Sequence, residues 1–399
     1  MRSVWWNRLT DRERAEIAEL TGSPPATAPD LLVVGAGLVG LCTAWYAADR
    51  GLSVVVIDAG DALGEASGAS FGGVWPNELG SMLDLPDDSP AAEAFQELAF
   101  SSRDLWGRLS VRPGFEIDWQ VNGFLQVDAQ RLQPTAEAFT ERALNRGYSL
   151  AECDAEQVAT LEPALAPCPH GGVRYPSEAR LNPLKAGLAL IRGIRQKGGR
   201  VVTHAAARSL QTNSVGDQLE VAVETPTAAI TIRPKAVVAA SGANLSWLGE
   251  RANLVPIRPT TSEAVATGPV APLLTSTIGG RFLVQQLRTG EVIAGGTTVE
   301  GRLDQPRPAT IQEIIAATRQ LIPALANVEF PSAWCGARSS TPDGQPILDL
   351  VPGTRRVWLA VGHHRAGILM ATGTGRLLAD WIADDQAPGI DAFRLARFS

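Results

Sequence analysis

Two of the four histidines lie beside an arginine near the C-terminus, in the segment GHHRAGIL at residues 362–369. A glycine turn followed by apolar residues predicts a helix that begins near Ile368. The first turn of a helix offers unpaired N–H groups and the positive end of the helix dipole. Three potential cations at this point suggest an acid–base cluster or a site where negative charge is stabilised.

A second motif lies near the N-terminus, in the segment VVGAGLVG at residues 33–40. Its glycines have the spacing G-x-G-x-x-G, directly after a strand pattern and directly before a helical pattern. Gly35 permits a tight turn, Gly37 admits the close approach of a pyrophosphate, and Gly40 lets helix and strand pack closely. The predicted dinucleotide contacts in this motif are Gly35, Gly37, Leu38, Val39 and Gly40.

Asp58 closes the next strand pattern, eighteen residues after Gly40. A carboxylate at this point can accept hydrogen bonds from both hydroxyls of a ribose, and it would repel a 2′-phosphate. The nucleotide is therefore predicted to be FAD or NAD and not NADP, with Ala59 as a further contact. Small residues follow at residues 66–80, ASGASFGGVWPNELG, where a flavin could pass close to the backbone or a surface loop could lie.

Length and composition limit the possible classes of protein. A chain of 399 residues favours two domains. Its content of 45% hydrophobic residues, with no run of eighteen consecutive apolar residues, indicates a globular protein without a transmembrane segment. The net charge of −7 disfavours nucleic acid as a partner. The four cysteines lack C-x-x-C spacing, so no metal site is predicted. Charges interrupt residues 1–20, which predicts no secretory signal and a cytoplasmic location.

The order of elements predicts an α/β nucleotide-binding domain that is interrupted by antiparallel segments. Residues 1–20 resemble an amphipathic helix and residues 21–30 a proline-rich linker. Residues 31–58 predict a strand, a helix and a parallel strand, and residues 91–109 a further helix. Trp5 and Trp6 suggest a docking element or a helix packed onto its own domain.

Four further segments resemble, in order and spacing, the D-amino-acid oxidase-like FAD-dependent oxidoreductases of the glycine oxidase and sarcosine oxidase-like branch. They are GGVRYPSEARLNP at 171–183, RFLVQQLRTGEVIAGGTTVEG at 281–301, WCGARSSTPDGQPILD at 334–349, and GHHRAGIL with the helix behind it. The resemblance covers roughly residues 31–385 and leaves an N-terminal extension, residues 1–30, outside it.

The resemblance implies a fold, a discontinuous Rossmann-like FAD-binding domain with an inserted antiparallel-sheet α+β substrate domain. The FAD-binding domain would comprise residues 31–105, 171–249 and 337–399. The substrate domain would comprise residues 106–170 and 250–336.

The resemblance also implies FAD as the cofactor and adds residues to its site. The implied contacts beyond the fingerprint are Ser67, Ser70, Gly72, Gly73, Gly242, Gly336, His363, Arg365, Gly367 and Ile368. Sarcosine oxidases attach their flavin through a cysteine at the position of Gly336, whereas Cys335 here is one residue away. A non-covalent flavin is therefore predicted. Those enzymes also have a lysine at the position of Leu369, and because no lysine follows Lys235 here, the lysine that they use for oxygen activation is missing too.

The chemistry that the resemblance implies is oxidation of a C–N bond beside a carboxylate, by hydride transfer from the α-carbon to flavin N5. Arg338 matches the arginine that binds the substrate carboxylate, and Gln285 is a second candidate for substrate binding. Arg365 would stabilise negative charge on the reduced flavin, His363 would lie near the ring, and His364 would pack or face solvent.

The predicted function is oxidation of a small amino acid or N-substituted glycine to an imine that hydrolyses. Two alternatives remain, a 2-hydroxy-acid oxidase and the flavin-bearing electron-relay subunit of a heteromeric dehydrogenase. The electron acceptor is either oxygen or a protein or quinone, and the chain could form a homo-oligomer or a heteromeric complex.

Overall fold

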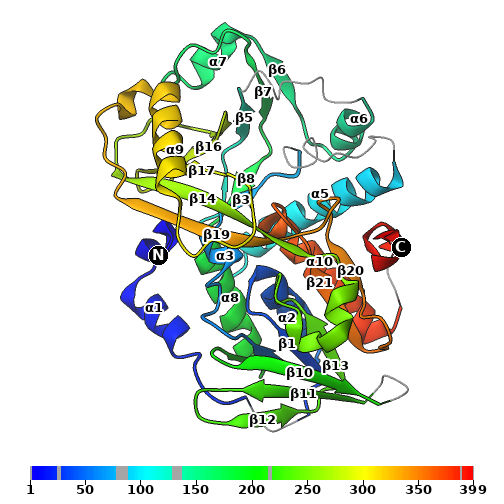
Figure 1. Cartoon of the computed structure of the whole chain (residues 1–399). Helices are drawn as coiled ribbons and strands as arrows, with labels where there is room; N and C mark the ends of the chain where they lie inside the picture. Colours follow the sequence, from blue (N-terminus) through cyan, green and yellow to red (C-terminus); the bar gives the residue numbers. More distant parts are fainter. Residues whose placement is uncertain are drawn as a thin grey trace.

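The computed structural model describes residues 2–24, 28–77, 89–127, 137–213, 218–386 and 389–398 (Figure 1). Its strands form a six-stranded sheet, a nine-stranded sheet and two three-stranded sheets. Figure 1 shows the six-stranded sheet with its helices in the lower half of the molecule and the nine-stranded sheet in the upper half.

The six-stranded sheet has the order β20-β21-β13-β1-β2-β9. Neighbouring strands are parallel except for the antiparallel pair β20 and β21. The four central strands are buried along their whole length, as expected for apolar strands covered on both faces. The strands are β1 (Leu31–Val34), β2 (Val54–Ile57), β9 (Arg200–Val202), β13 (Ala236–Ala239), β20 (Ile347–Leu350) and β21 (Val357–Val361).

The predicted strand–helix–strand unit is confirmed. α2 (Leu38–Asp49) connects β1 to β2, and the two strands pair in parallel with Leu31 opposite Val54. The next strand, β9, continues the parallel order beyond β2. The carboxyl ends of these strands, where ligands bind in sheets of this kind, are thus brought to one edge.

The two faces of the sheet are covered differently. Leu31 and Val33 join an apolar core with α2, α8 (Pro183–Gln196) and α10 (Gly367–Asp384). The alternate β1 residues join a second core with the three-stranded sheet of β10 (Ala206–Thr212), β11 (Leu219–Glu224) and β12 (Ala229–Ile232).

Small residues let α10 approach its neighbours closely. A Cβ at Gly375 would lie 2.6 Å from the backbone carbon of Cys42 in α2. A Cβ at Gly373 would lie 2.2 Å from the Ser102 hydroxyl in α5 (Pro90–Ser110). Because neither glycine has room for a side chain, α10 is held against both helices and its N-terminus has a fixed position.

The nine-stranded sheet has the order β18-β14-β17-β16-β15-β5-β7-β6, and β19 pairs with β14. The β14–β19 pair is antiparallel and runs from Arg258 opposite Ser340 to Ala266 opposite Ser332. The strands are β5 (Phe124–Gln126), β6 (Ala151–Cys153), β7 (Gly172–Tyr175), β14 (Arg258–Pro269), β15 (Thr277–Gly279), β16 (Leu283–Gln286), β17 (Glu291–Gly295), β18 (Val299–Glu300) and β19 (Ser332–Ser340).

The predicted division into domains stays a prediction, and several strands pair across it. β7, within the range predicted for the FAD-binding domain, pairs with β5 in the nine-stranded sheet. β19 crosses the predicted boundary between residues 336 and 337 and remains in one sheet throughout. Strand pairing over nine residues leaves no hinge at that boundary.

Other predicted elements are confirmed within one or two residues. The helix predicted at residues 91–109 is α5, which begins after the Ser89 side chain caps the Ala92 N–H. The segment at residues 281–301, which carries part of the resemblance, contains the antiparallel strands β16 and β17. The N-terminal helix is instead a 3₁₀ turn, η1 (Val4–Arg8), followed by α1 (Asp11–Ala18).

The remaining elements connect the two large sheets or lie at the surface. They are α3 (Ala66–Ala69), β3 (Gly73–Val74), β4 (Gln120–Val121), α6 (Glu137–Asn145), α7 (Ala155–Leu161), β8 (Ala179–Arg180), η2 (Ser246–Leu254), α9 (Pro308–Leu321), η3 (Pro323–Leu325), η4 (Asp391–Phe393) and η5 (Leu395–Phe398). None of the helices in the described part of the chain is long and apolar enough to cross a membrane.

Candidate active site

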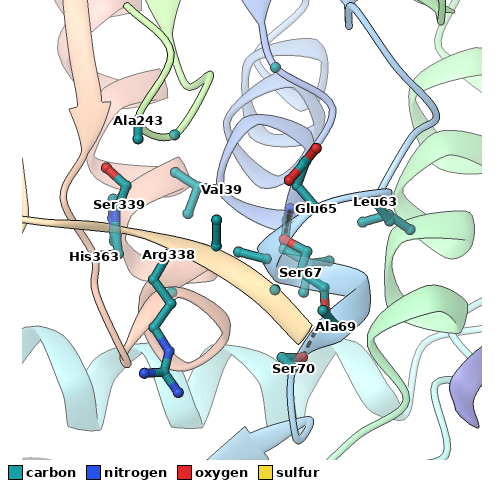
Figure 2. A pocket seen from close by; sticks show the side chains of 18 of the residues that line it. Val39, Leu63, Glu65, Ser67, Ala69, Ser70, Ala243, Arg338, Ser339 and His363 are labelled. Atoms are coloured by element: carbon teal, nitrogen blue, oxygen red, sulfur yellow. Dashed lines mark hydrogen bonds between the residues drawn. The ribbon is translucent and has the colours of Figure 1, made fainter. Parts of the chain in front are cut away.

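A cavity of about 860 Å³ extends from the carboxyl ends of β1 and β2 to β19 and the N-terminus of α10. Figure 2 shows Ser67, Ala69 and Ser70 on one side of this cavity and Ser339 and His363 on the other. The predicted site residues that line it are Gly35, Gly37, Leu38, Val39, Asp58, Ala59, Ser67, Ser70, Gly72, Gly73, Gly242, Gly336, Arg338, His363, Arg365, Gly367 and Ile368. Gly40 and Gln285 do not line it.

The glycine fingerprint has no room for side chains. Gly35 has φ +118°, and a Cβ there would lie 2.3 Å from the Ala240 carbonyl oxygen. A Cβ at Gly40 would lie 2.0 Å from the Gly35 carbonyl oxygen, so Gly40 lies behind the wall and packs α2 against β1. Gly37 is the N-cap of α2, and no side chain caps the helix there. Gly37 therefore brings backbone without a side chain to the cavity.

Asp58 fixes the fingerprint turn from the next strand. Its carboxylate accepts hydrogen bonds from the Ala36 N–H at 2.7 Å and the Gly60 N–H at 2.9 Å. Burial raises the pKa of Asp58, and these two hydrogen bonds oppose that rise. Each carboxylate oxygen can accept more than one hydrogen bond, so the group can bind ribose hydroxyls while it holds the turn.

The small-residue loop, residues 66–73, forms the wall opposite α10. Ser67 joins this loop to the fingerprint because its hydroxyl accepts a hydrogen bond from the Leu38 N–H at 3.0 Å. Gly72 has φ +73°, and a Cβ there would lie 2.2 Å from the Leu181 carbonyl oxygen. A Cβ at Gly336 of β19 would lie 2.4 Å from the Ala69 Cβ. The backbone of β19 at Gly336 therefore packs directly against the Ala69 methyl group of the loop.

The structure corrects the predicted role of Gln285 as a substrate-binding residue. Its side chain is fully buried, and its amide nitrogen donates to the Phe71 carbonyl at 2.5 Å. Leu283, two residues earlier on the same strand face, lines the cavity instead. Gln285 is oriented toward the loop and holds it from behind.

The two histidines before α10 are neutral side chains and not cations. His363 is buried and its Nε2 lies 3.0 Å from the Thr374 hydroxyl; burial lowers its pKa to about 4. His364 lines the cavity, and burial, with Arg338 and Arg365 nearby, lowers its pKa to about 4. The suggestion of an acid–base cluster of three cations is therefore wrong, and His364 is part of the cavity wall.

α10 begins at Gly367, one residue before the predicted start. Ala366 is its N-cap, and no side chain caps the helix there. The preceding turn is fixed by the His364 N–H, which donates to the Ser339 carbonyl at 2.9 Å. The positive end of the α10 dipole thus faces the cavity beside β19.

Arg338 projects from β19 at the cavity (Figure 2). Its Nη1 donates to the Thr297 carbonyl at 3.2 Å and the Thr298 hydroxyl at 3.3 Å, and both acceptors are neutral. Burial, and Arg365 nearby, lower its pKa to about 9, so it is a cation at neutral pH. Within the described ranges of the chain, no carboxylate pairs with Arg338. Its charge is available to an anion in the cavity.

Cys335 points away from the cavity, as its place next to Gly336 on an extended segment predicted. Its thiol donates to the Leu303 carbonyl at 3.4 Å, and it is absent from the cavity wall. No set of three or more histidine, cysteine, aspartate or glutamate side chains grouped for a metal ion occurs among the residues whose structure is described.

Sequence reasoning missed two parts of the wall. Glu65 and Arg302 both line the cavity and pair at 2.8 Å, although 237 residues separate them. Trp75 lines it as a buried ring that packs edge-on against Phe124 at 5.3 Å between ring centroids. No motif marks Glu65 or Arg302, and Trp75, although it lies in the small-residue segment 66–80, carries no signal of its own as a wall residue.

Comparison with known proteins agrees with this arrangement. The family model of the DAO type, described as FAD dependent oxidoreductase, matches residues 30–381. The chain belongs to this family. It is an FAD-dependent oxidoreductase, and the prediction of FAD as cofactor is confirmed.

Individual relatives of this oxidoreductase match nearly the whole chain. A glycine oxidase of Geobacillus kaustophilus is 28% identical over 388 residues, which cover 93% of this chain and 96% of that protein. A D-amino acid dehydrogenase of Paramagnetospirillum magneticum is 27% identical and covers 92% of this chain and 99% of its own. The crystal structure of glycine oxidase from Geobacillus kaustophilus has a TM-score of 0.79 at 24% identity, over 93% and 98% of the chains. This likeness confirms the predicted fold class.

The cavity of this FAD-dependent oxidoreductase suits its cofactor. Its volume lies within the ~300–1,000 Å³ usual for ligand sites. Gly35 and Gly336 leave open backbone where any side chain would clash. The starts of α2 and α10, whose N-cap residues carry no capping side chain, present positive dipole ends that could face a pyrophosphate and a second electron-rich group.

Proposed function

We propose that the enzyme oxidises the C–N bond of a small amino acid or N-substituted glycine and releases an imine that water hydrolyses. Non-covalently bound FAD supplies the hydride acceptor for this reaction. The observation that carries the proposal is Arg338, a cation on the cavity wall whose hydrogen-bond partners are neutral.

In this proposal Arg338 binds the substrate carboxylate. A guanidinium presents its N–H groups as a planar fork that matches the two oxygens of a carboxylate. The Thr297 carbonyl and the Thr298 hydroxyl, which accept from one guanidinium nitrogen, would keep the fork oriented. Binding at this point fixes which end of the substrate faces the reacting centre.

The residues proposed to hold FAD form two groups. The fingerprint with Asp58 and Ala59 would bind the adenylate half and the pyrophosphate. The small-residue loop, together with Gly242, Gly336 and residues 363–368, would bind the flavin half. Arg365 and the N-terminus of α10 would stabilise negative charge that develops at that end of the cavity.

The substrate amine needs no dedicated basic side chain. His363 and His364 have pKa values of about 4 and are weak bases. The positive charges of Arg338 and Arg365 would instead lower the pKa of a bound ammonium group, since like charges disfavour the charged form. The amine would thus lose its proton on binding and become ready for oxidation.

An amine substrate is favoured over the two alternatives. The relatives named glycine oxidase and D-amino acid dehydrogenase carry amine substrates in their names, which favours an amine over a 2-hydroxy acid. A cavity that would hold FAD beside an arginine whose hydrogen-bond partners are neutral favours turnover of a substrate over pure electron relay. The acceptor is proposed to be oxygen or a protein or quinone.

Anaerobic bleaching of the flavin tests the proposal. Purified enzyme is mixed with a panel of small amino acids, N-methylated glycines and 2-hydroxy acids, and flavin absorbance is followed before and after air is admitted. We expect bleaching by an amine substrate. Bleaching by hydroxy acids alone would overturn the proposal, and recovery in air separates oxygen from other acceptors.

An Arg338→Leu variant should retain FAD and lose substrate reduction. Removing one partner of a buried charged pair costs ~2–5 kcal/mol, so kcat/KM should fall about thirtyfold to several thousandfold. Arg338→Lys is the matched control, because it keeps the charge without the fork and should lose less. Unchanged kinetics in Arg338→Leu would remove this residue from the substrate site.

A further inference from the structure

The N-terminal segment of residues 3–20, here called the N-terminal clamp, lies outside the family match, which begins at residue 30. It comprises η1 and α1, joined by a Thr10–Glu13 capping box. Val4, Trp5 and Trp6 are buried, so the clamp packs against the rest of the molecule. Figure 1 shows it, in blue, alongside α3 and α8.

Two side chains of the clamp bond the backbone of the small-residue loop. The Ser3 hydroxyl donates to the Gly68 carbonyl at 2.5 Å, and the Trp5 indole N–H donates to the Ser70 carbonyl at 2.7 Å. The Trp5 ring also closes off Gly72 from behind, since a Cβ there would lie 3.2 Å from it.

The carbonyls of Ala69 and Phe71 in the same loop also accept hydrogen bonds from side chains, which come from other segments. The Ala69 carbonyl accepts from the Trp334 indole N–H at 2.8 Å, and the Phe71 carbonyl accepts from the Gln285 amide at 2.5 Å. Four successive carbonyls, from Gly68 to Phe71, are therefore bonded by four side chains distant in sequence. The last carbonyls of a helix as short as α3 have no hydrogen-bond partner inside the helix. The four side-chain donors therefore fix the orientation of the loop backbone.

The clamp is itself attached to both large sheets. Glu16 pairs with Arg192 of α8 at 2.7 Å, on the helical face of the six-stranded sheet. Arg8 pairs with Glu291 of β17 at 2.5 Å, and both of these side chains are largely buried. The clamp thus fixes the position of the loop relative to the two large sheets, and the cavity lies between these sheets.

We propose that the N-terminal clamp is a working part of the cofactor site, with Ser3 and Trp5 as positioning residues for FAD. Ser3 and Trp5 donate hydrogen bonds to loop carbonyls on the side away from the cavity. The small side chains and the backbone of residues 66–73 are thus left to contact the flavin. The proposal rests on the proposed assignment of this loop to FAD. It predicts that the clamp sets how tightly FAD is held.

Three variants test the clamp. Trp5→Phe removes the indole N–H and keeps an aromatic ring, Ser3→Ala removes the hydroxyl, and Ser3→Thr retains it. Glu19→Gln, an exposed position at the end of α1, is the matched control. The apoproteins are titrated with FAD, and the dissociation constant is measured from quenching of flavin fluorescence.

We expect the FAD dissociation constant to rise about 3- to 10-fold in Trp5→Phe and in Ser3→Ala, the effect of one buried hydrogen bond. It should stay near the wild-type value in Ser3→Thr and in Glu19→Gln. The midpoint of thermal unfolding of each apoprotein is measured in parallel with its FAD dissociation constant. If the midpoints fall while the FAD dissociation constants do not change, the clamp only stabilises the fold and the proposal is overturned.

Hydrogen exchange separates failure of the clamp from failure of the proposed site. In the wild-type enzyme, FAD should slow amide exchange in residues 66–73. If FAD leaves that exchange unchanged, the assignment of the loop to FAD is wrong and the clamp proposal falls with it. If FAD slows it and the clamp variants bind FAD as the wild type does, the clamp proposal alone is wrong.

Discussion

At the scale of single residues, burial decides the charge state of the site. His363 and His364 stand next to each other at the start of α10, yet both are neutral at physiological pH because burial disfavours their protonated forms. Arg338 lies in the same wall and keeps its charge, as a guanidinium does in nearly any environment. The wall therefore offers an anion a cation flanked by neutral rings.

The neutral histidines predict a loss of stability in acid. Their pKa is about 4 in the folded protein and 6.5 for an ordinary histidine, so the unfolded chain binds more protons between these values. The free energy of unfolding should consequently decrease as the pH drops from about 6.5 to 4, by up to ~3 kcal/mol for a fully buried histidine. Urea unfolding of the apoprotein across this range measures the loss.

A His363→Gln variant isolates one of the two contributions. Glutamine does not titrate, so the variant should be less stable than the wild type at pH 7 and lose less stability on acidification. An identical pH dependence in the variant and the wild type would show that His363 does not remain neutral in the folded protein.

At the scale of secondary-structure elements, close packing fixes the helix starts that face the cavity. α10 is held between α2 and α5 because Gly375 and Gly373 bring backbone and side-chain atoms of its neighbours into contact. α2 is held against β1 by Gly40 in the same way. Both helix N-termini thereby face one cavity, where the proposed cofactor would meet both dipoles.

Gly375→Ala should destabilise the enzyme although alanine is the better helix former. The new Cβ would lie 2.6 Å from backbone of α2, and overpacking of this kind costs ~1–3 kcal/mol. Gly107→Ala in α5 is the matched control, because its Cβ would meet nothing closer than 3.9 Å and should be neutral or stabilise by up to ~1 kcal/mol. Urea unfolding compares the two, and equal effects would contradict the packing argument.

At the scale of the whole molecule, the cavity is assembled from segments that lie far apart in the chain. The fingerprint, the small-residue loop, β19 and the start of α10 each supply one wall, and the N-terminal clamp and Gln285 support the loop from behind. A ligand that touches all of these walls should stabilise the folded state as a unit, because unfolding of either sheet would release it.

Free FAD should therefore raise the unfolding free energy of the apoprotein, by ~2.7 kcal/mol when its concentration is a hundred times the dissociation constant. FMN, which lacks the adenylate half, should stabilise less at equal concentration since it cannot reach Asp58 and the fingerprint. Thermal midpoints with each flavin test this. Equal stabilisation by FMN and FAD would remove the adenylate contacts from the proposed site.

The fingerprint turn and the helix and strand that follow it could be predicted from the order of residues alone. The fingerprint, α2 and Asp58 are consecutive in the chain, so glycine spacing and strand and helix periodicity were enough to predict their arrangement. Arg338 and the start of α10 could be predicted from the resemblance, because their motifs are short and their positions follow from local sequence.

Four other features could not be predicted from the sequence. They are the protonation of the histidines, the orientation of Gln285, the Glu65–Arg302 pair and the attachment of the N-terminal clamp. Each of these depends on which distant segment packs against a residue and on how much water that packing excludes. A pattern of residue types along the chain carries the period of a helix or strand. It does not carry the burial of a side chain or the identity of a partner hundreds of residues away.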